Sequence, residues 1–290
     1  MFVKIENQFL SVKIAKKGAE LASVMNKTNH LGYLWDGNAE FWAKTSPVLF
    51  PIVGTLKENK YRYNDAWYSL PRHGFARDNV FSVEESGKSE VVFKLVDSPD
   101  TLKVFPFHFE LRLRYKLEEA VLYVTYEVTN TGDGDMYFSI GGHPAFRVPM
   151  TETSGYEDHY LEFSEPEDAD HWPITAEGLI DKLPLPLLNS SRTLKLTRGL
   201  FAGDALVLKG LKSKSVKLGS DTHDYRVEIN FDGFPYLGIW AAPGADFVCI
   251  EPWCGIADSV ASDQELTRKE GIESLAAGRS WSRTWSAAFY

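Results

Sequence analysis

Apolar and polar residues alternate along most of this chain, and a period of two is typical of β-strands. In "FELRLRYKL", residues 109–117, every second side chain is apolar and those between are charged. After a short turn, "VLYVTYEVTN" at 121–130 repeats the alternation, so the two segments predict a long hairpin with one face toward solvent. The stretches 91–96 and 225–231 alternate in the same way. The pattern predicts an all-β protein.

Helical signals are few and short. "NAEFWAKTSP" predicts a short helix that ends at Pro47, and "SDQELTRKEG" carries the spacing of a capping box, Ser262 with Glu265. The stretch 150–200 is the richest in proline, serine, threonine and acidic residues. Because strand patterns lie on both sides of it, we interpret it as a surface excursion rather than a linker. The prediction is one large antiparallel β-sandwich, a single domain over residues 1–290.

Composition narrows the classes of function. The chain has 290 residues, 44% of them hydrophobic, enough for a sizeable core. A net charge of -9 disfavours nucleic acid or an anionic membrane as the partner. No apolar run approaches the ~20 residues that cross a bilayer, and the start lacks the apolar core of a signal peptide. Two cysteines are too few for a structural zinc site. We expect a cytoplasmic protein, either a monomer or a homodimer.

Three titratable residues stand beside proline or glycine at the end of an apolar strand, and one of them is a carboxylate. Glu251 follows the apolar run 247–250 and precedes Pro252. Burial of a carboxylate is unfavourable unless it is paired, and it raises the pKa toward the range of a general base. Glu251 is therefore either half of a buried ion pair with an arginine or a general base. Trp253 favours the second interpretation, because aromatic faces beside carboxylates recur in sugar sites.

Two histidines share this setting. "SIGGHPAF" places His143 after two glycines and before Pro144, which restricts the histidine backbone to extended conformations. A lone histidine at a strand end is usually structural, but glycine inside a strand often marks the close approach of a ligand. In "LPRHGFARD", His73 lies between Pro71 and Gly74, which favour a tight turn as much as an open site. Both interpretations stay open for each histidine.

Other chemistry has no local signal. The chain lacks a Gly-x-Ser-x-Gly motif and any His-x-His or His-x-x-x-His pair, so we expect no metal and no nucleophilic serine. Two histidines and a carboxylate on a β scaffold with eight tryptophans suit proton transfer on a carbohydrate. Four aromatic residues lie close in sequence to these groups: Trp240, Trp253, Phe75 and Phe146.

The chain resembles the aldose 1-epimerase (galactose mutarotase) superfamily, and within it the LacX-like branch from bacterial sugar operons. The segments that carry the resemblance are "LFPIVGTLKENKY…LPRHGFARD", "FSIGGHPAF", "FAGDALVLKGLKSKSVKL" and "CIEPWCGIAD", in this order. They cover nearly the whole chain, and "HGFARD" together with "GGHPAF" is fairly specific. The resemblance implies a galactose mutarotase-like β-supersandwich with an open cleft across one sheet, no cofactor and no metal.

The resemblance also implies roles for individual residues in the interconversion of the α and β anomers of a hexose. Glu251 would be the general base and His143 the general acid. His73 and Asp204 would contact the ring or its hydroxyls, although the sequence context of Asp204 alone indicates only a turn. Trp253 is a further candidate for sugar binding.

This sequence departs from the family at one position. Better characterised galactose mutarotases have an arginine that contacts the sugar, and Thr55 stands in its place here. Lys57, Arg72 and Arg77 are the candidates to replace it. Two alternatives therefore stay open: a hexose-6-phosphate 1-epimerase, in which Arg72 and Arg77 would hold the phosphate, and a non-catalytic carbohydrate-binding protein.

Overall fold

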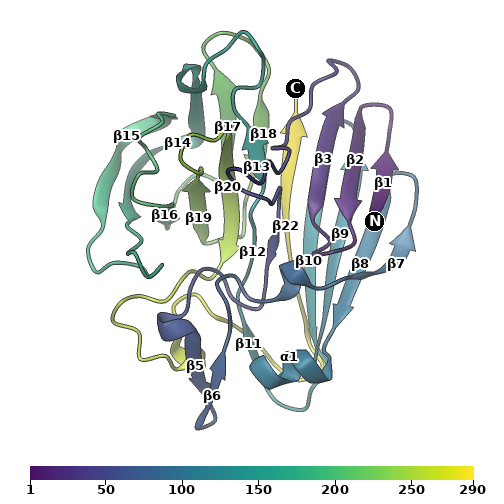
Figure 1. Cartoon of the computed structure of the whole chain (residues 1–290), viewed down its shortest axis with the longest axis vertical. Helices are drawn as coiled ribbons and strands as arrows, with labels where there is room; N and C mark the ends of the chain where they lie inside the picture. The colour runs from purple at the N-terminus through teal and green to yellow at the C-terminus, as the bar shows by residue number, and fades with distance from the viewer.

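The structure is a computed structural model that describes residues 1–290, and it confirms a large antiparallel β-sandwich (Figure 1). Fifteen strands form the main sheet. Thirteen of them follow one another in the order β4 (Val48–Leu49), β12 (Ile140–Gly142), β20 (Phe247–Cys254), β19 (Tyr236–Trp240), β16 (Leu206–Lys209), β14 (His159–Trp172), β17 (Ser215–Ser220), β18 (Val227–Asn230), β22 (Ser280–Phe289), β10 (Val121–Asn130), β9 (Phe109–Glu118), β8 (Glu90–Val96) and β7 (Ser82–Ser86). Off this path, β13 (Ala145–Arg147) pairs with β20, and β15 (Leu185–Lys195) pairs with β14.

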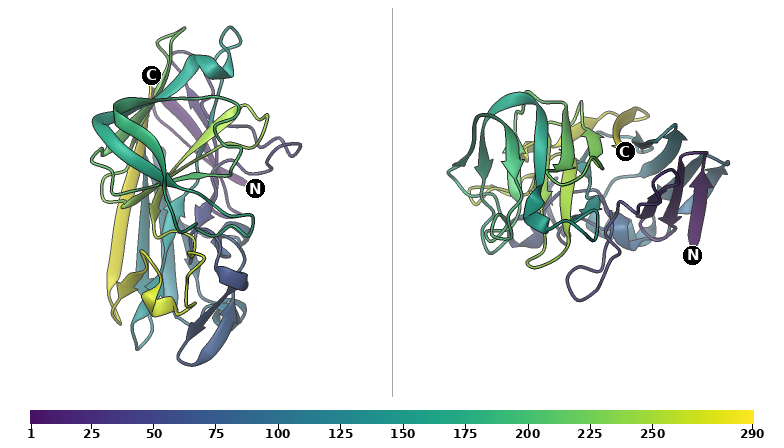
Figure 2. Two further views of the ribbon diagram at one scale, coloured as in Figure 1. Left: turned by 90° about the vertical axis from the view of Figure 1, so that its left-hand side faces the viewer. Right: turned by 90° about the horizontal axis from the view of Figure 1, so that it is seen from above.

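Three smaller sheets complete the strands. The first, β1 (Phe2–Glu6), β2 (Leu10–Ala15) and β3 (Leu21–Asn26), faces β8 to β10 across the core (Figures 1 and 2). The others are the pairs β5 (Lys60–Tyr63) with β6 (Ala66–Ser69) and β11 (Met136–Phe138) with β21 (Glu273–Leu275). The helical segments are α1 (Pro99–Val104) and the 3-10 turns η1 (Lys57–Asn59), η2 (Ala76–Asp78), η3 (Tyr156–Asp158) and η4 (Leu266–Arg268). No helix is long and apolar enough to span a bilayer.

The alternating segments form the hairpin that their pattern predicts. Strand β9 pairs with β10, with Leu113 opposite Tyr126 and Leu117 opposite Leu122. The apolar side chains of β9 are buried, while the charged ones between them lie on the outer face. On the far side of β10, strand β22 adds Trp285 to the same core. Alternation of buried and exposed positions thus fixes the register here, because a slip of one residue would expose the whole apolar face.

Strand β20 is buried along its whole length. All eight of its residues are buried, and it pairs with β19 on one side and with β12 and β13 on the other. A strand covered on both faces reads as a continuous apolar run, as residues 247–250 do. Glu251 follows that run but lies inside the strand rather than at its end. The fold therefore holds a carboxylate in the interior of the main sheet.

Both helix predictions are wrong, and the sequence analysis did not predict helix α1. Residues 38–47 form turns and bends and no helix, and the carbonyl of Trp42 accepts a hydrogen bond from the Trp35 indole (2.9 Å) instead of a helical one. The stretch that contains Ser262 forms only the 3-10 turn η4. Helix α1 begins after Ser98, whose hydroxyl caps it, and has Pro99 in its first turn. Serine followed by proline was the signal for this helix.

The stretch 150–200 is only in part a surface excursion. Strand β14 lies inside the main sheet between β16 and β17, and β15 pairs along its edge. Leu161 and Phe163 of β14 are fully buried, whereas the acidic residues of the stretch mostly face outward. The acidic composition of this stretch made the alternation of buried and exposed residues in β14 hard to recognise from the sequence.

One buried ion pair connects the loops at one end of the main sheet. The ammonium group of Lys269 donates to Asp258 Oδ1 (2.9 Å) and to the carbonyl of Ile256 (2.6 Å), and both charged side chains are 3% exposed. The backbone N–H of Asp258 donates to the carbonyl of Thr55, and its carbonyl accepts from Ile180. The pair therefore joins three segments that are distant in sequence.

Breaking this pair from one side should be costly, because it leaves a buried charge without its partner. For Lys269→Met we expect the free energy of unfolding to fall by about 3 to 5 kcal/mol. Chemical denaturation followed by tryptophan fluorescence measures it. The control is Lys103→Ala, which removes an exposed pair with Asp100 and should change stability by less than about 0.5 kcal/mol. Equal effects of the two substitutions would contradict the structural role assigned to Lys269.

Candidate functional site

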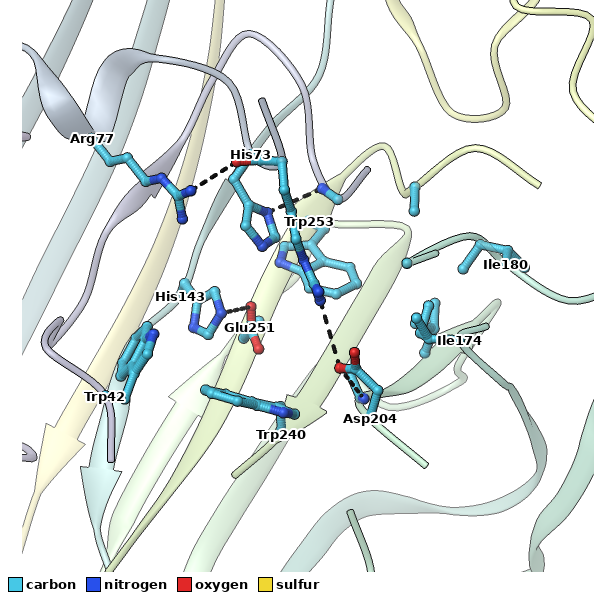
Figure 3. A pocket seen from close by; sticks show the side chains of 16 residues that line it. Trp42, His73, Arg77, His143, Ile174, Ile180, Asp204, Trp240, Glu251 and Trp253 are labelled. Carbon is cyan, nitrogen blue, oxygen red and sulfur yellow. Dashed lines mark hydrogen bonds and ion pairs between the residues drawn. The ribbon is translucent and has the colours of Figure 1, made fainter. Parts of the chain in front are cut away.

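One cavity brings together all six site residues that were expected from the sequence. It has a volume of about 250 Å³ and lies over β20, β19 and the ends of β12 and β16 (Figure 3). The six expected residues that line it are Glu251, His143, His73, Asp204, Arg77 and Trp253. They come from four separate segments of the chain, so the fold and not the sequence makes them neighbours.

His143 and Glu251 are in contact at the wall of this cavity. Nε2 of His143 lies 3.2 Å from Oε2 of Glu251 (Figure 3). Glu251 projects from β20 opposite Gly238, and His143 follows β12 at the turn into β13. No arginine lies within ion-pair distance of Glu251. The interpretation of Glu251 as the partner of a buried arginine is therefore wrong.

Burial acts on both members of the pair. Desolvation raises the pKa of Glu251 well above its usual range, although the nearby Arg72 charge opposes the effect. Desolvation, with a smaller contribution from Arg72, lowers the pKa of His143 to about 3. Both directions favour the uncharged forms, a carboxylic acid beside a neutral imidazole. At neutral pH the two groups thus hold one proton between them.

His73 is held by the backbone of Gly54. The N–H of Gly54 donates to Nδ1 of His73 (3.1 Å), and the N–H of His73 donates to the carbonyl of Gly54 (2.8 Å). Nδ1 is therefore the acceptor, and the ring proton lies on Nε2. The ring meets His143 edge to face, with centroids 5.6 Å apart. Burial lowers the pKa of His73 well below its usual value, so this ring is neutral as well.

The glycine after His73 serves a tight turn. Gly74 has a φ of +69°, and a Cβ there would collide with the carbonyl oxygen of Phe50. Close packing between these two backbone segments requires glycine at this position. Of the two interpretations of this glycine, the structure shows the turn.

The two glycines before His143 make room for aromatic side chains of the protein rather than for a ligand. A Cβ on Gly141 would lie 2.5 Å from Cδ1 of Trp253, and one on Gly142 would lie 2.7 Å from the hydroxyl of Tyr126. On the neighbouring strand, Gly238 leaves space for the six-membered ring of Trp253. The expectation that these glycines clear the way for a ligand is therefore wrong. Gly141 and Gly238 seat the Trp253 indole, which lines the cavity.

Trp42 is an aromatic residue of the cavity that sequence analysis missed. Its ring stacks on the imidazole of His143, with centroids 4.9 Å apart and planes at 29°. Trp240 meets the same imidazole edge to face at 5.8 Å. Of the four aromatic residues noted near the titratable groups, Trp240 and Trp253 line the cavity, whereas Phe75 and Phe146 pack in the core. Trp42 lies in the loop that was mistaken for a helix, and no local pattern distinguished it.

A charged pair, Arg72 and Asp204, lines the same cavity. Arg72 Nη2 lies 3.5 Å from Asp204 Oδ1, which also accepts from the backbone N–H of Ala205 (Figure 3). Asp204 has a φ of +77°, so it is a turn residue, as its context indicated, and a cavity residue as well. Arg77 lies alongside and donates to the carbonyl of Arg72 (2.8 Å).

The structure distinguishes among the cations considered for the family's arginine. Arg72 and Arg77 line the cavity, whereas Lys57 donates to the carbonyl of Ser262 and does not line it. Thr55 is buried beneath Gly178, where a Cβ would lie 2.6 Å from the threonine hydroxyl. The loop that contains Gly178 also supplies Ile174 and Ile180 to the cavity wall, and it belongs to the stretch that was interpreted as a surface excursion.

One set of donors has the composition of a metal site. Ligand atoms of His143, Cys249 and Glu251 all lie within 4.8 Å of one another. Cys249 and the other cysteine, Cys254, are both free and buried. Sequence analysis expected no metal, because these three residues form no local motif.

A sequence profile described as aldose 1-epimerase matches residues 1–273. The chain belongs to this family. The chromosomal protein LacX of Lactococcus lactis subsp. lactis is 35% identical over 283 residues, which cover 94% of each chain. These matches confirm the family and the LacX-like branch that the four sequence segments indicated.

Solved structures agree with the family in fold. A galactose mutarotase related enzyme from Lactobacillus acidophilus superposes with a TM-score of 0.96 at 34% identity, covering 100% of this chain and 97% of that one. A galactose mutarotase-like protein from Lactobacillus casei ATCC 334 gives 0.94 at 30% identity, with 100% of both chains covered. The fold of this family member is the galactose mutarotase-like supersandwich.

Proposed function

We propose that this member of the aldose 1-epimerase family interconverts the α and β anomers of a hexose by general acid–base catalysis. The observation that carries the proposal is the contact of 3.2 Å between His143 Nε2 and Glu251 Oε2 at a cavity of about 250 Å³. The two groups are more than a hundred positions apart in sequence, and each is almost fully buried. Anomer exchange needs two such groups side by side, because one proton leaves the sugar where another enters.

The proton balance of the reaction suits a pair that shares one proton. In the cyclic sugar complex Glu251 is the carboxylate and His143 the imidazolium. Glu251 takes the proton from the C1 hydroxyl while His143 gives one to the ring oxygen, and the C1–O5 bond breaks to leave an aldehyde. Rotation about C1–C2 and the reverse transfers close the ring on the other face. The two residues end each cycle in their starting states.

Burial favours the ring-opening direction of this exchange. Ring opening converts the charged pair into a carboxylic acid and a neutral imidazole. These are the forms toward which burial shifts the pKa values of Glu251 and His143. The stacked ring of Trp42 stabilises the imidazolium in the cyclic complex, since an aromatic face attracts a cation. The energies of the two proton arrangements are thereby brought together, which keeps either transfer from being strongly uphill.

The rest of the cavity supports a sugar as the substrate. Trp240 and Trp253 offer faces and edges for the C–H surface of a pyranose. Arg72 donates and Asp204 accepts at one end of the cavity, and adjacent hydroxyls can bond to both. We assign Arg72 to the role of the arginine that the family places where Thr55 stands here, and His73 to a contact with the ring through Nε2–H.

The charge of this end of the cavity favours an unphosphorylated aldose over a hexose 6-phosphate. The guanidinium of Arg72 is paired with the carboxylate of Asp204. A phosphate bound to Arg72 would have to displace this carboxylate, or the carboxylate would repel it. The presence of both members of the acid–base pair likewise favours an enzyme over a non-catalytic sugar-binding protein. Polarimetry with glucose and with glucose 6-phosphate distinguishes the two substrates.

Removal of either proton-transfer group should abolish most turnover. We expect Glu251→Gln and His143→Asn each to lower kcat by roughly 10² to 10⁴, because each replaces one positioned acid or base with an amide that does not titrate. Polarimetry of freshly dissolved α-glucose and α-galactose measures the rate, and calorimetry should still detect sugar binding. The controls are Glu118→Gln and His108→Asn, which lie on exposed positions outside the cavity. Wild-type rates in either cavity variant would refute the assignment.

The pH profile should lack the usual histidine limb. Because burial lowers the pKa of His143 to about 3, lowering the pH from 7 to 5 adds no proton to the pair, and kcat/KM should stay within about twofold. The loss at high pH should follow the raised pKa of the pair. The rate without enzyme is subtracted at each pH, since acid and base catalyse anomer exchange themselves. A tenfold fall that follows a group of pKa near about 6.5 would contradict the account.

A further inference from the structure

A third chemically active side chain stands beside the acid–base pair, and the proposed reaction does not use it. Cys249 precedes Glu251 by two residues in β20, so both side chains project from the same face of the strand. The turn after β12 brings His143 onto that face. Ligand atoms of the three residues lie within 4.8 Å of one another, and Nε2 of His143 and Oε2 of Glu251 are 3.2 Å apart.

The geometry is close to that of a tetrahedral metal site. Zinc–ligand distances of about 2.0 to 2.3 Å place neighbouring donor atoms about 3.3 to 3.7 Å apart. The His143–Glu251 separation of 3.2 Å lies just below the lower end of this range. Since no separation exceeds 4.8 Å, a side-chain movement of roughly 1 Å brings the set within range.

No group outside the three residues occupies these donor atoms. Oε2 of Glu251 is buried and its close polar neighbour is Nε2 of His143, itself one of the three, while Cys249 is a free thiol that is 0% exposed. A buried carboxylate whose neighbour is a neutral imidazole has no charge to balance it, so a cation that binds both groups gains affinity. The cavity beside His143 and Glu251 provides an entry path and leaves a fourth coordination position open.

We propose that His143, Cys249 and Glu251 form a three-ligand site for a borderline-soft divalent cation such as Zn²⁺, and that its occupation blocks the site to sugar turnover. One nitrogen, one sulfur and one oxygen donor suit Zn²⁺ or Cd²⁺, whereas Mg²⁺ and Ca²⁺ require oxygen donors. Binding releases two protons to solvent, one from the thiol of Cys249 and the one that His143 and Glu251 share, and the metal takes their place. The ion would use the imidazole nitrogen and the carboxylate that the proposed reaction needs, so the inhibition, but not the binding, rests on the proposed function.

Zinc titration of the full-length protein tests the site directly. Isothermal titration calorimetry with ZnCl₂ should show one site per chain, and MgCl₂ should give no heat of binding. Cys249→Ala should raise the zinc Kd at least about tenfold, because one of three ligands is lost. Cys254→Ala is the matched control, since it removes the same atoms from another buried position of β20 and should leave the zinc Kd unchanged. Zinc should also inhibit anomer exchange in the wild type, with chelation restoring the rate.

Cobalt gives a test that needs no variant. Co²⁺ in place of Zn²⁺ should produce the near-ultraviolet charge-transfer absorption of a cobalt–thiolate bond in the wild type. Absence of this absorption, or an equal zinc Kd in wild type and Cys249→Ala, would overturn the proposal. Both readouts measure binding, so a chain that binds zinc through Cys249 but never exchanges anomers would refute the proposed function and not the metal site.

Discussion

A carboxylate held without solvent inside a fully buried strand is the constraint on which the rest of the site depends. Glu251 is 1% exposed, and the sheet offers it no arginine, only the imidazole of His143. Because desolvation disfavours the charged form of each residue, the two groups share one proton. The same burial that destabilises the charged pair favours its uncharged proton arrangement, and the Trp42 ring stacked on His143 opposes this preference. The buried pair lowers the stability of the fold, and in return the two residues can transfer a proton in either direction.

The surrounding structure serves to hold these two groups in place. Gly141 and Gly238 seat the indole of Trp253 next to Glu251, while Trp42 stacks on the ring of His143. Farther out, the buried pair of Lys269 and Asp258 joins loops that border the cavity. Each layer is therefore made of contacts within the protein, and the sugar is expected to meet a cavity that is already formed.

Much of this structure could be predicted from the sequence, because local alternation dictates which face of a strand is buried. The hairpin of β9 and β10 followed from its pattern alone, and the titratable residues beside proline and glycine pointed to His143 and Glu251. Their meeting could not be predicted from local signals, since only the pairing of β20 with β12 and β13 creates it. The resemblance to the aldose 1-epimerase family supplied that long-range information.

Some errors came from local patterns that tertiary contacts override. The loop that carries Trp42 has the composition of a short helix, yet its conformation is set by contacts with Trp35 and His143. The acidic residues around β14 concealed a strand whose Leu161 belongs to the core. The glycines before His143 were expected to mark the close approach of a ligand, but the groups that approach them are Trp253 at Gly141 and Tyr126 at Gly142.

The central claim is that one hexose ring bridges the imidazole and the carboxyl across this cavity. A crystal structure of the Glu251→Gln variant soaked with glucose or galactose tests it most directly, because the variant should bind sugar without turning it over. The account predicts O1 of the sugar within about 3.2 Å of the residue 251 side chain and O5 within the same distance of His143 Nε2. A ring bound with C1 and O5 directed away from both residues, or bound outside the cavity, would contradict it.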